Sequence, residues 1–379
     1  MSGRAYPSIR VKGGPRERGR QYGEQARELV RRSVTAYAAV FDYYAGITWE
    51  AACAQAERFI EPIEAYDDRY LDEMRGIAEG AALDFGDILA LNLRSEFMFA
   101  QGAKAAAGEP APRPKGCSSV AVLPGASENG HTLLGQNWDW LIHAWETTVV
   151  LESEQDEGPN FVTVVEAGLL AKAGMNAAGL GLATNTLISD RDVGEPGVPY
   201  HVCLRSLLDA PSIVDALARL QRAYRSSSAN YVLAHADGLV VNVESTPGGS
   251  ADLLLGGPRH GTVAHTNHFV SPRFGDCDTG LALMPDSFFR LQRLTDALQA
   301  ARPMIAQAQL QQMFADHAGH PYGVCTHPDP ATPPVDQAAT VASLIMDLDR
   351  RRLWLADGNP CEAPYREIDL MDLLRGRPA

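Results

Sequence analysis

The sequence predicts an α+β fold built mainly from antiparallel sheets. In the first hundred residues, apolar side chains recur every three or four positions, which is the spacing of one buried helix face. From residue 117 onward, short β-rich runs bounded by Gly, Pro, Asn and Asp alternate with helical segments. Hairpins with interposed helices are typical of antiparallel α+β folds.

The expected elements follow from these patterns in order along the chain. Thr48 is a plausible helix cap, because its hydroxyl can accept an N–H of the first turn. Helices are expected over 16–41, 48–59, 63–79, 85–99, 198–210, 213–223, 287–300 and 308–317. Strands are expected over 120–123, 132–136, 147–151, 161–165, 180–184, 231–234, 239–243, 262–265, 341–347 and 352–356.

Bulk composition limits the classes of function. A net charge of −14 disfavours nucleic acid and anionic membrane surfaces as partners. The first residues lack the apolar core of a secretory signal, and no run approaches the ~20 apolar residues that span a bilayer. The cysteines are scattered without a C-x-x-C pair, as expected for reduced thiols. We therefore expect a soluble cytoplasmic protein with no nucleic-acid or membrane partner.

Cys117 stands between two very different stretches. Residues 103–115 are rich in Ala and Pro and are expected to form an exposed connector, whereas an apolar strand follows the cysteine. With a turn over 124–130, the antiparallel partner of Cys117 is near Asn137, and Asp139 lies just beyond it. The hairpin thus predicts a thiol beside a carboxylate.

A thiol reacts as the thiolate, so Cys117 needs a base or a positive neighbour. His131 is near the turn, at the wrong end of the hairpin, so a papain-like pair would require a distant histidine such as His265 or His268. Cutting the Gly116–Cys117 bond would instead create an α-amino group with a pKa of ~7.7–8.0, which suits proton transfer. The pattern also allows a buried cysteine that only packs.

Several motifs occur in one order along the chain. They are GGPRERGRQYGEQ (13–25), KGCSS (115–119), GQNWDW (135–140), GLATNTL (181–187), AHTNHF (264–269), DSFFRLQRL (286–294), DHAGHPYGVCTHPD (316–329), TVASLIMDL (340–348) and LADGNPC (355–361). Together they resemble the isopenicillin N acyltransferase (acyl-CoA:6-aminopenicillanic acid acyltransferase) family of N-terminal nucleophile hydrolases. The resemblance implies a four-layer αββα sandwich.

The resemblance also implies a precursor that cuts itself between Gly116 and Cys117. The products would be a helical α-fragment, 1–116, ending in the connector at about 103–116, and a β-fragment, 117–379, that carries the catalytic core. The fragments would stay associated. The thiol would then take the acyl group of a small acyl amide or an acyl-CoA donor as a thioester and pass it to water or an amine, without a cofactor.

Four further residues receive catalytic roles from the resemblance. Asp139 would hold the amino group of Cys117, Asn267 would donate to the oxyanion, and Arg290 would favour the thiolate. Asn185 matches a second asparagine near the nucleophile in the related bile-salt and penicillin V enzymes. From the residues alone, both asparagines are also ordinary turn formers, and Arg290 suits an exposed helix face.

Four side chains are expected to touch substrate: Gln136, Trp138, His268 and Cys325. Gln136 departs from the bile-salt and penicillin V enzymes, which carry arginine at that position. The departure removes a positive charge near the thiol, so bile-salt specificity is not expected here.

A histidine-rich stretch offers a competing function. His317, His320, Cys325 and His327 lie close together in sequence, and thiol and imidazole groups can ligate zinc. Their spacing, H-x2-H-x4-C-x-H, is not that of a zinc finger, and prolines keep the stretch irregular. We expect a loop near the active site and no metal. The alternatives are a non-maturing binding protein of the same fold, stabilised here by zinc, and the papain-like hydrolase.

Overall fold

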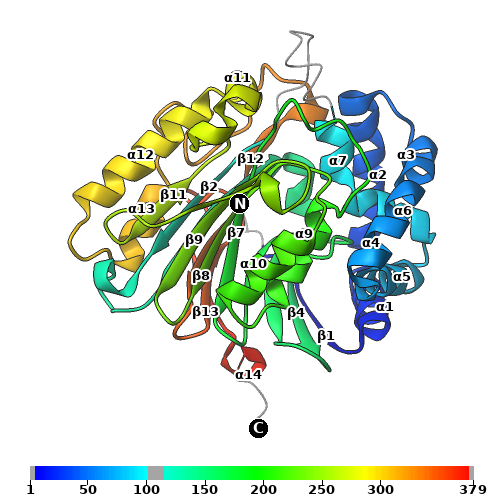
Figure 1. Ribbon diagram of the computed structural model, residues 1–379, viewed down its shortest axis with the longest axis horizontal. Helices are drawn as coiled ribbons and strands as arrows, with labels where there is room; N and C mark the ends of the chain where they lie inside the picture. Colours follow the sequence, from blue (N-terminus) through cyan, green and yellow to red (C-terminus); the bar gives the residue numbers. More distant parts are fainter. Residues whose placement is uncertain (1–4, 101–114, 375–379) are drawn as a thin grey trace.

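The computed structural model describes residues 5–100 and 115–374, which form two stacked β-sheets with helices on both outer faces (Figure 1). The eight-stranded sheet contains, in spatial order, β1 (Ser8–Gly13), β4 (Thr148–Gln155), β5 (Phe161–Glu166), β6 (Ala173–Asn176), β7 (Leu180–Thr186), β8 (Ala229–His235), β9 (Leu239–Ser245) and β10 (Leu253–Gly256). The six-stranded sheet contains β11 (Thr262–His265), β2 (Cys117–Val122), β3 (Leu133–Leu141), β12 (Ala338–Asp347), β13 (Arg352–Ala356) and β14 (Arg366–Asp369).

Helices complete a four-layer αββα sandwich, which confirms the expected fold class. The layer beside the larger sheet contains α1 (Pro15–Gln25), α2 (Arg27–Ala45), α3 (Trp49–Ala56), α4 (Ile60–Asp67), α5 (Arg69–Ala81), α6 (Phe85–Asn92), α7 (Arg94–Phe99), α9 (Tyr200–Leu208) and α10 (Ile213–Arg222). The layer beside the smaller sheet, yellow in Figure 1, contains α11 (Gly280–Leu283), α12 (Asp286–Ala300) and α13 (Gln307–Phe314). A short helix, α14 (Met371–Leu374), follows β14.

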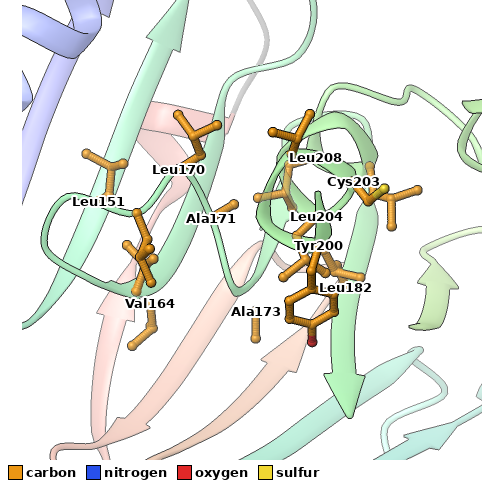
Figure 2. Close-up of a cluster of buried hydrophobic side chains, with 14 of the residues drawn as sticks. Leu151, Val164, Leu170, Ala171, Ala173, Leu182, Tyr200, Cys203, Leu204 and Leu208 are labelled. Atoms are coloured by element: carbon orange, nitrogen blue, oxygen red, sulfur yellow. The ribbon is translucent and has the colours of Figure 1, made fainter. Parts of the chain in front are cut away.

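Apolar packing joins α9 to the larger sheet. Figure 2 shows Tyr200 and Leu204 of α9 beside Leu182 of β7, and all three side chains are buried. The Tyr200 hydroxyl lies 2.6 Å from Thr184 Oγ1, so this aromatic ring satisfies its polar end inside the core. The packing places α9 against β7, a strand whose other contacts include β2, which carries Cys117.

Local patterns predicted most of these elements correctly. The Thr48 side chain accepts a hydrogen bond from Ala51 N at 3.2 Å, as expected of a helix cap. Four short strands, β1, β6, β10 and β14, were not predicted. β1 pairs in parallel with β4, in contrast to the antiparallel pairing of its neighbours, so the segment before Cys117 is not wholly helical. Residues 103–114 of the expected connector lie outside the described residues.

The expected hairpin forms, but its register differs by one residue. Cys117 pairs with Trp138, and Asn137 pairs with Ser118. The connection over 123–132 is centred between Ser127 and Glu128, because a short 3-10 turn replaces the simple turn assumed from the sequence. A one-residue slip exchanges the two faces of a strand. The correction therefore puts Cys117 and Trp138 on the same face.

None of the helices within residues 5–100 and 115–374 is both long and apolar enough to cross a membrane.

Glycines let α1 and α5 pack with their backbones in contact. Gly19 and Gly23 on α1 face Gly76 and Gly80 on α5, and a Cβ atom on any of them would overlap a backbone carbonyl of the other helix. No rotamer change relieves an overlap with backbone, so the contact requires glycine on both helices.

We predict that Gly23→Ala destabilises the fold by about 1–3 kcal/mol, because the methyl group would push α1 off the Ile77 carbonyl. Urea unfolding followed by circular dichroism measures the change. Gly86→Ala is the matched control, since its Cβ would lie at an ordinary 3.6 Å from Cys53 Cβ. Equal midpoints for the two variants would contradict the packing argument.

Candidate active site

The peptide bond between Gly116 and Cys117 is held by hydrogen bonds at both polar atoms. The Gly116 carbonyl accepts from the backbone N–H of Asp139 at 3.0 Å, and Cys117 N donates to Asn267 Oδ1 at 2.7 Å. Cys117 begins β2 with its side chain buried. A Cβ on Gly116 would lie 2.7 Å from both Asn267 Oδ1 and Arg290 Nη2, so a larger residue before the cysteine would displace these two side chains.

Arg290, on α12, holds the next carbonyl. Its guanidinium donates to Cys117 O at 3.0 Å, to Ser118 Oγ at 3.1 Å and to Asn267 Oδ1 at 3.0 Å. Its Nε donates to Asp286 Oδ2 at 2.9 Å. Because the arginine is only 2% exposed, it is not the solvated helix residue that the sequence alone allowed.

Asn185 reaches Cys117 from the other sheet. Its Nδ2 donates to Cys117 O at 3.0 Å, and its Oδ1 accepts from Ser119 Oγ and from Asn230 Nδ2, the latter at 3.1 Å. The residue lies inside strand β7 and not in a turn. The sheets therefore meet at the carbonyl of Cys117.

The side-chain amide of Asn267 is oriented by its donors. Oδ1 accepts from both Cys117 N and Arg290, so Nδ2 points to the Thr186 carbonyl at 2.9 Å. With Gly116 and Cys117 joined, Asn267 thus accepts a hydrogen bond from the cysteine N–H. Its expected role as an oxyanion donor requires a different partner for Nδ2 and stays a prediction.

Asp139 carries the buried carboxylate of the site. Its Oδ1 accepts from Thr340 Oγ1 at 2.6 Å, whereas Oδ2 has no hydrogen-bond partner among the described residues. Burial raises the pKa of Asp139 to about 7, although the charge of Arg290 opposes the shift. Its backbone N–H binds Gly116, and its carboxylate retains one unused acceptor.

Lys172, which the sequence reasoning missed, places a second cation at the thiol. It precedes β6, is fully buried, and its Nζ lies 3.3 Å from the Tyr200 hydroxyl and 5.9 Å from the centre of the Trp138 ring. Burial lowers the pKa of Lys172 to about 8, while Cys117 opposes the shift. A lysine within the apolar stretch 161–175 was the available signal, because a buried lysine requires a specific partner.

The thiol of Cys117 experiences opposing influences. Burial raises its pKa, and the nearby Asp139 carboxylate raises it as well. The positive charges of Lys172 and Arg290 and the Asp139 backbone N–H lower it. Burial outweighs these charges, so the pKa of Cys117 is raised overall, and the groups that oppose the rise are two cations and a backbone N–H.

The two histidines considered for a papain-like pair are already engaged. His265 Nε2 lies 2.8 Å from Glu244 Oε1, and its Nδ1 lies 2.9 Å from the Thr266 carbonyl. His268 Nδ1 lies 2.8 Å from Ser287 Oγ, and burial lowers the pKa of His268 to about 4. Within the part of the chain that the structure describes, no histidine hydrogen-bonds to Cys117.

The expected substrate residues are not gathered in one place. Gln136 accepts from Thr184 N at 2.9 Å and donates to Thr184 O at 2.8 Å, so its amide bridges the two sheets. Trp138 is buried opposite Cys117, with Lys172 over its ring. Cys325 lies in a separate cluster of histidines and cysteines. Substrate contacts by Gln136, Trp138, His268 and Cys325 stay predictions.

The two residues that precede Cys117 form part of the wall of a small pocket. Gly116 and Lys115 line this pocket together with Asp139 and Arg290. Lys115 Nζ forms a buried ion pair with Asp336 at 2.8 Å. This pocket therefore lies next to the Gly116–Cys117 bond and shares Asp139 and Arg290 with the surroundings of Cys117.

Comparison with known proteins relates most of the chain to one family. Residues 126–362 match the family described as acyl-coenzyme A:6-aminopenicillanic acid acyl-transferase; the match contains Asp139, Asn185, Asn267 and Arg290 and starts after Cys117. A relative, the 40 kDa form of acyl-coenzyme A:6-aminopenicillanic-acid-acyltransferase from Emericella nidulans, is 24% identical over 324 residues, 84% of each chain.

Two similar solved structures are a mutant conjugated bile acid hydrolase from Clostridium perfringens and a penicillin V acylase from Agrobacterium tumefaciens. The first has a TM-score of 0.47 and 13% identity over 69% of this chain and 95% of that chain. The second has a TM-score of 0.45 and 17% identity over 68% of this chain and 88% of that chain.

We predict that Asp139 makes stability fall as pH rises between about 4 and about 7. The buried carboxyl has a pKa of about 7, above its unfolded value, so the folded protein holds its proton more tightly in this window. Asp139→Asn removes this dependence. Relative to the aspartate protein, its unfolding free energy should rise by up to about 4 kcal/mol across the window and level off above it.

Urea unfolding over this pH range measures the difference. Both proteins carry Cys117→Ala, so that the expected self-cleavage is blocked and only residue 139 differs. A free-energy difference that is constant with pH would contradict a raised Asp139 pKa.

Proposed function

Because the chain belongs to the acyl-coenzyme A:6-aminopenicillanic acid acyltransferase family, we propose that it is a self-processing enzyme with Cys117 as nucleophile. Acyl transfer or amide hydrolysis is the chemistry that the family supports. The substrate class we propose is a small acyl amide or a peptide-like compound, with an acyl-CoA as a second kind of acyl donor. The acyl group would pass through a thioester on Cys117 to water or to an amine.

One observation carries the proposal: both polar atoms of the Gly116–Cys117 peptide bond are hydrogen-bonded, by Asp139 on β3 and by Asn267 after β11. Asp139 N binds the Gly116 carbonyl oxygen at 3.0 Å, the atom on which negative charge develops when a nucleophile attacks that carbonyl. Asn267 binds Cys117 N at 2.7 Å, on the leaving side of the same bond. The Asp139 contact continues the β2–β3 ladder by one residue, whereas the Asn267 side chain reaches the bond from outside that ladder.

The proposed cut proceeds in two balanced steps. Cys117 Sγ, as thiolate, attacks the Gly116 carbonyl carbon, the C–N bond breaks, and the amide nitrogen takes up a proton to become an amine. Water then attacks the thioester, which releases the Gly116 carboxylate and restores the thiol. The amine, with a reference pKa of ~7.7–8.0, becomes the base of the mature enzyme.

The same groups then serve a substrate. Departure of Lys115 and Gly116 would break the ion pair to Asp336 and open the pocket. A substrate carbonyl in the place of the Gly116 carbonyl would meet the Asp139 N–H as donor. The unused Asp139 Oδ2 supports the expected role of this carboxylate as an acceptor for the new amino group.

Contacts across the proposed cut support fragments that remain associated. β1 is hydrogen-bonded to β4. The buried Arg94 guanidinium pairs with Glu166 at 2.7 Å, and Trp140 Nε1 donates to the Tyr37 hydroxyl at 2.7 Å. An unpaired buried charge is costly, so separation of the fragments would be strongly disfavoured.

We propose that Lys172 supplies the positive charge near the thiol that an arginine would supply at the position of Gln136. Its ammonium lies above Trp138, the cross-strand neighbour of Cys117. The charges that face Lys172 come from Arg94 on α7, Glu166 on β5 and Cys117 itself. An ammonium beside the thiol favours the thiolate at neutral pH.

We predict that the wild-type chain is recovered as two polypeptides that meet at Gly116 and Cys117 and co-elute in size-exclusion chromatography. Cys117→Ala should give one chain of 40.9 kDa, because no nucleophile remains. Intact mass spectrometry reads both results. Cys277→Ala, a change at another buried free thiol, should be processed like the wild type.

A wild-type protein that stays in one piece, or a Cys117→Ala chain that is still cut at Gly116, would contradict self-processing by Cys117. For the mature enzyme, incubation with a panel of acyl amides and acyl-CoA thioesters should add the mass of one acyl group to the 117–379 fragment. An adduct-free fragment that nevertheless turns over substrate would exclude the thioester.

We predict that Lys172→Met shifts the pH midpoint of self-cleavage upward by about one to two units, because loss of a positive neighbour raises the thiol pKa. The rate near neutral pH should fall by roughly tenfold or more. Lys172→Arg should retain most of the rate, and Lys12→Met, at an exposed site, should match the wild type. A lower rate with an unchanged midpoint would assign Lys172 a purely structural role.

A further inference from the structure

A second cluster of chemically reactive side chains lies outside the proposed active site. His317, Cys325 and His327 come from the segment between α13 and β12, and Cys361 comes from the segment between β13 and β14. One ligand atom from each residue lies within 4.8 Å of the others. We propose that these four residues bind one structural zinc ion.

The distances within the cluster are those of a tetrahedron around zinc. His317 Nε2 lies 3.1 Å from His327 Nε2, and the two sulfur atoms of Cys325 and Cys361 lie 3.6 Å apart. His327 Nε2 lies 3.6 Å from Cys325 Sγ and 3.4 Å from Cys361 Sγ.

With zinc–sulfur bonds near 2.3 Å and zinc–nitrogen bonds near 2.0–2.1 Å, tetrahedral geometry separates two nitrogens by roughly 3.3 Å, nitrogen and sulfur by about 3.5 Å, and two sulfurs by about 3.8 Å. The four distances given above agree with these values within a few tenths of an ångström. The convergence of all four residues on one point therefore fits a single ion of this size.

The surroundings resemble the outer shell of a metal site. Asn359 Nδ2 lies 3.5 Å from Cys325 Sγ, where it can donate to a thiolate. Glu362 Oε1 lies 4.0 Å from His327 Nδ1, the ring nitrogen that does not face the cluster. At this separation the carboxylate is not hydrogen-bonded to the imidazole, and it contributes a nearby negative charge. Two thiolates and two imidazoles favour zinc over magnesium or calcium, which prefer oxygen ligands.

The sequence argued against a metal here because the deciding ligand is distant along the chain. His320, counted with the others from its spacing, is not in the four-residue set, although its ring lies 5.3 Å from that of His327. Cys361 is 36 residues beyond Cys325 and joins the cluster only through the fold. The proposal also gives Cys325 a partner other than substrate.

The ion would fasten the loop that supports Asp139. Thr326, next to the ligand Cys325, donates its backbone N–H to Thr340 Oγ1 at 2.9 Å, and Thr340 Oγ1 donates to Asp139 Oδ1 at 2.6 Å. Tyr322 and Thr326 also line the pocket beside Gly116. The zinc would hold the pocket wall in place without touching the reacting atoms, so the inference stands apart from the proposed reaction.

Elemental analysis of the full chain, purified without a histidine tag from zinc-supplemented medium, tests the proposal. About one zinc per chain is expected in the wild type and in His320→Ala, the matched histidine outside the set, and less than a tenth of that in Cys361→Ser. Chelator treatment should lower the melting temperature of His320→Ala and leave that of Cys361→Ser unchanged.

Cobalt substitution covers the case in which Cys361→Ser does not fold. The chelated wild-type chain, titrated with Co²⁺ alone, should give the visible bands of a tetrahedral centre and a thiolate-to-cobalt charge-transfer band, saturating at one equivalent. Absence of both zinc and the cobalt spectrum would overturn the proposal. So would full zinc content in Cys361→Ser, or a Cys325–Cys361 disulfide in freshly prepared metal-free protein.

Discussion

The buried guanidinium of Arg290 is the interaction on which the geometry around Cys117 depends. A desolvated cation is costly unless acceptors surround it, and here they are the carbonyl of Cys117, the side chain of Asn267 and the carboxylate of Asp286. Because α12 carries the arginine, the helix layer, β2 and the turn after β11 are held together by one group. If one of these segments shifted, the guanidinium would lose a hydrogen-bond acceptor while still buried, so such shifts are disfavoured.

The contact between the two sheets imposes a second constraint. Gln136 and Asn185 span it in opposite directions, each bonded to backbone groups of the opposing sheet. Because side chains alternate along a strand, these bridges tolerate a single register of β2 against β3. Cys117 is accordingly directed inward beside Trp138, in a dry region where charges act strongly.

Local sequence patterns predicted the helices, most strands and the hairpin, because periodicity and turn residues act over short distances. The motifs led to Arg290, Asn185 and Asn267, and the structure brings all three to Cys117. The features that the sequence could not predict are non-local. They are the parallel pairing of β1 with β4, the exact register of β2 against β3, and the position of Lys172 near Cys117. No local pattern indicates which way a side-chain amide such as that of Asn267 will face.

β1 and Arg94 precede the proposed cut in the chain, whereas their partners β4 and Glu166 follow it. Cutting the chain would therefore leave the two fragments joined only by non-covalent contacts. The groups that hold the Gly116–Cys117 bond come from positions as distant as Asn267, so the proposed cut requires a chain that has already folded. Afterwards, unfolding would release two separate polypeptides, and refolding would become a bimolecular reaction. The stability of the cut protein would then depend on its concentration and on its unfolding rate, as in an obligate heterodimer.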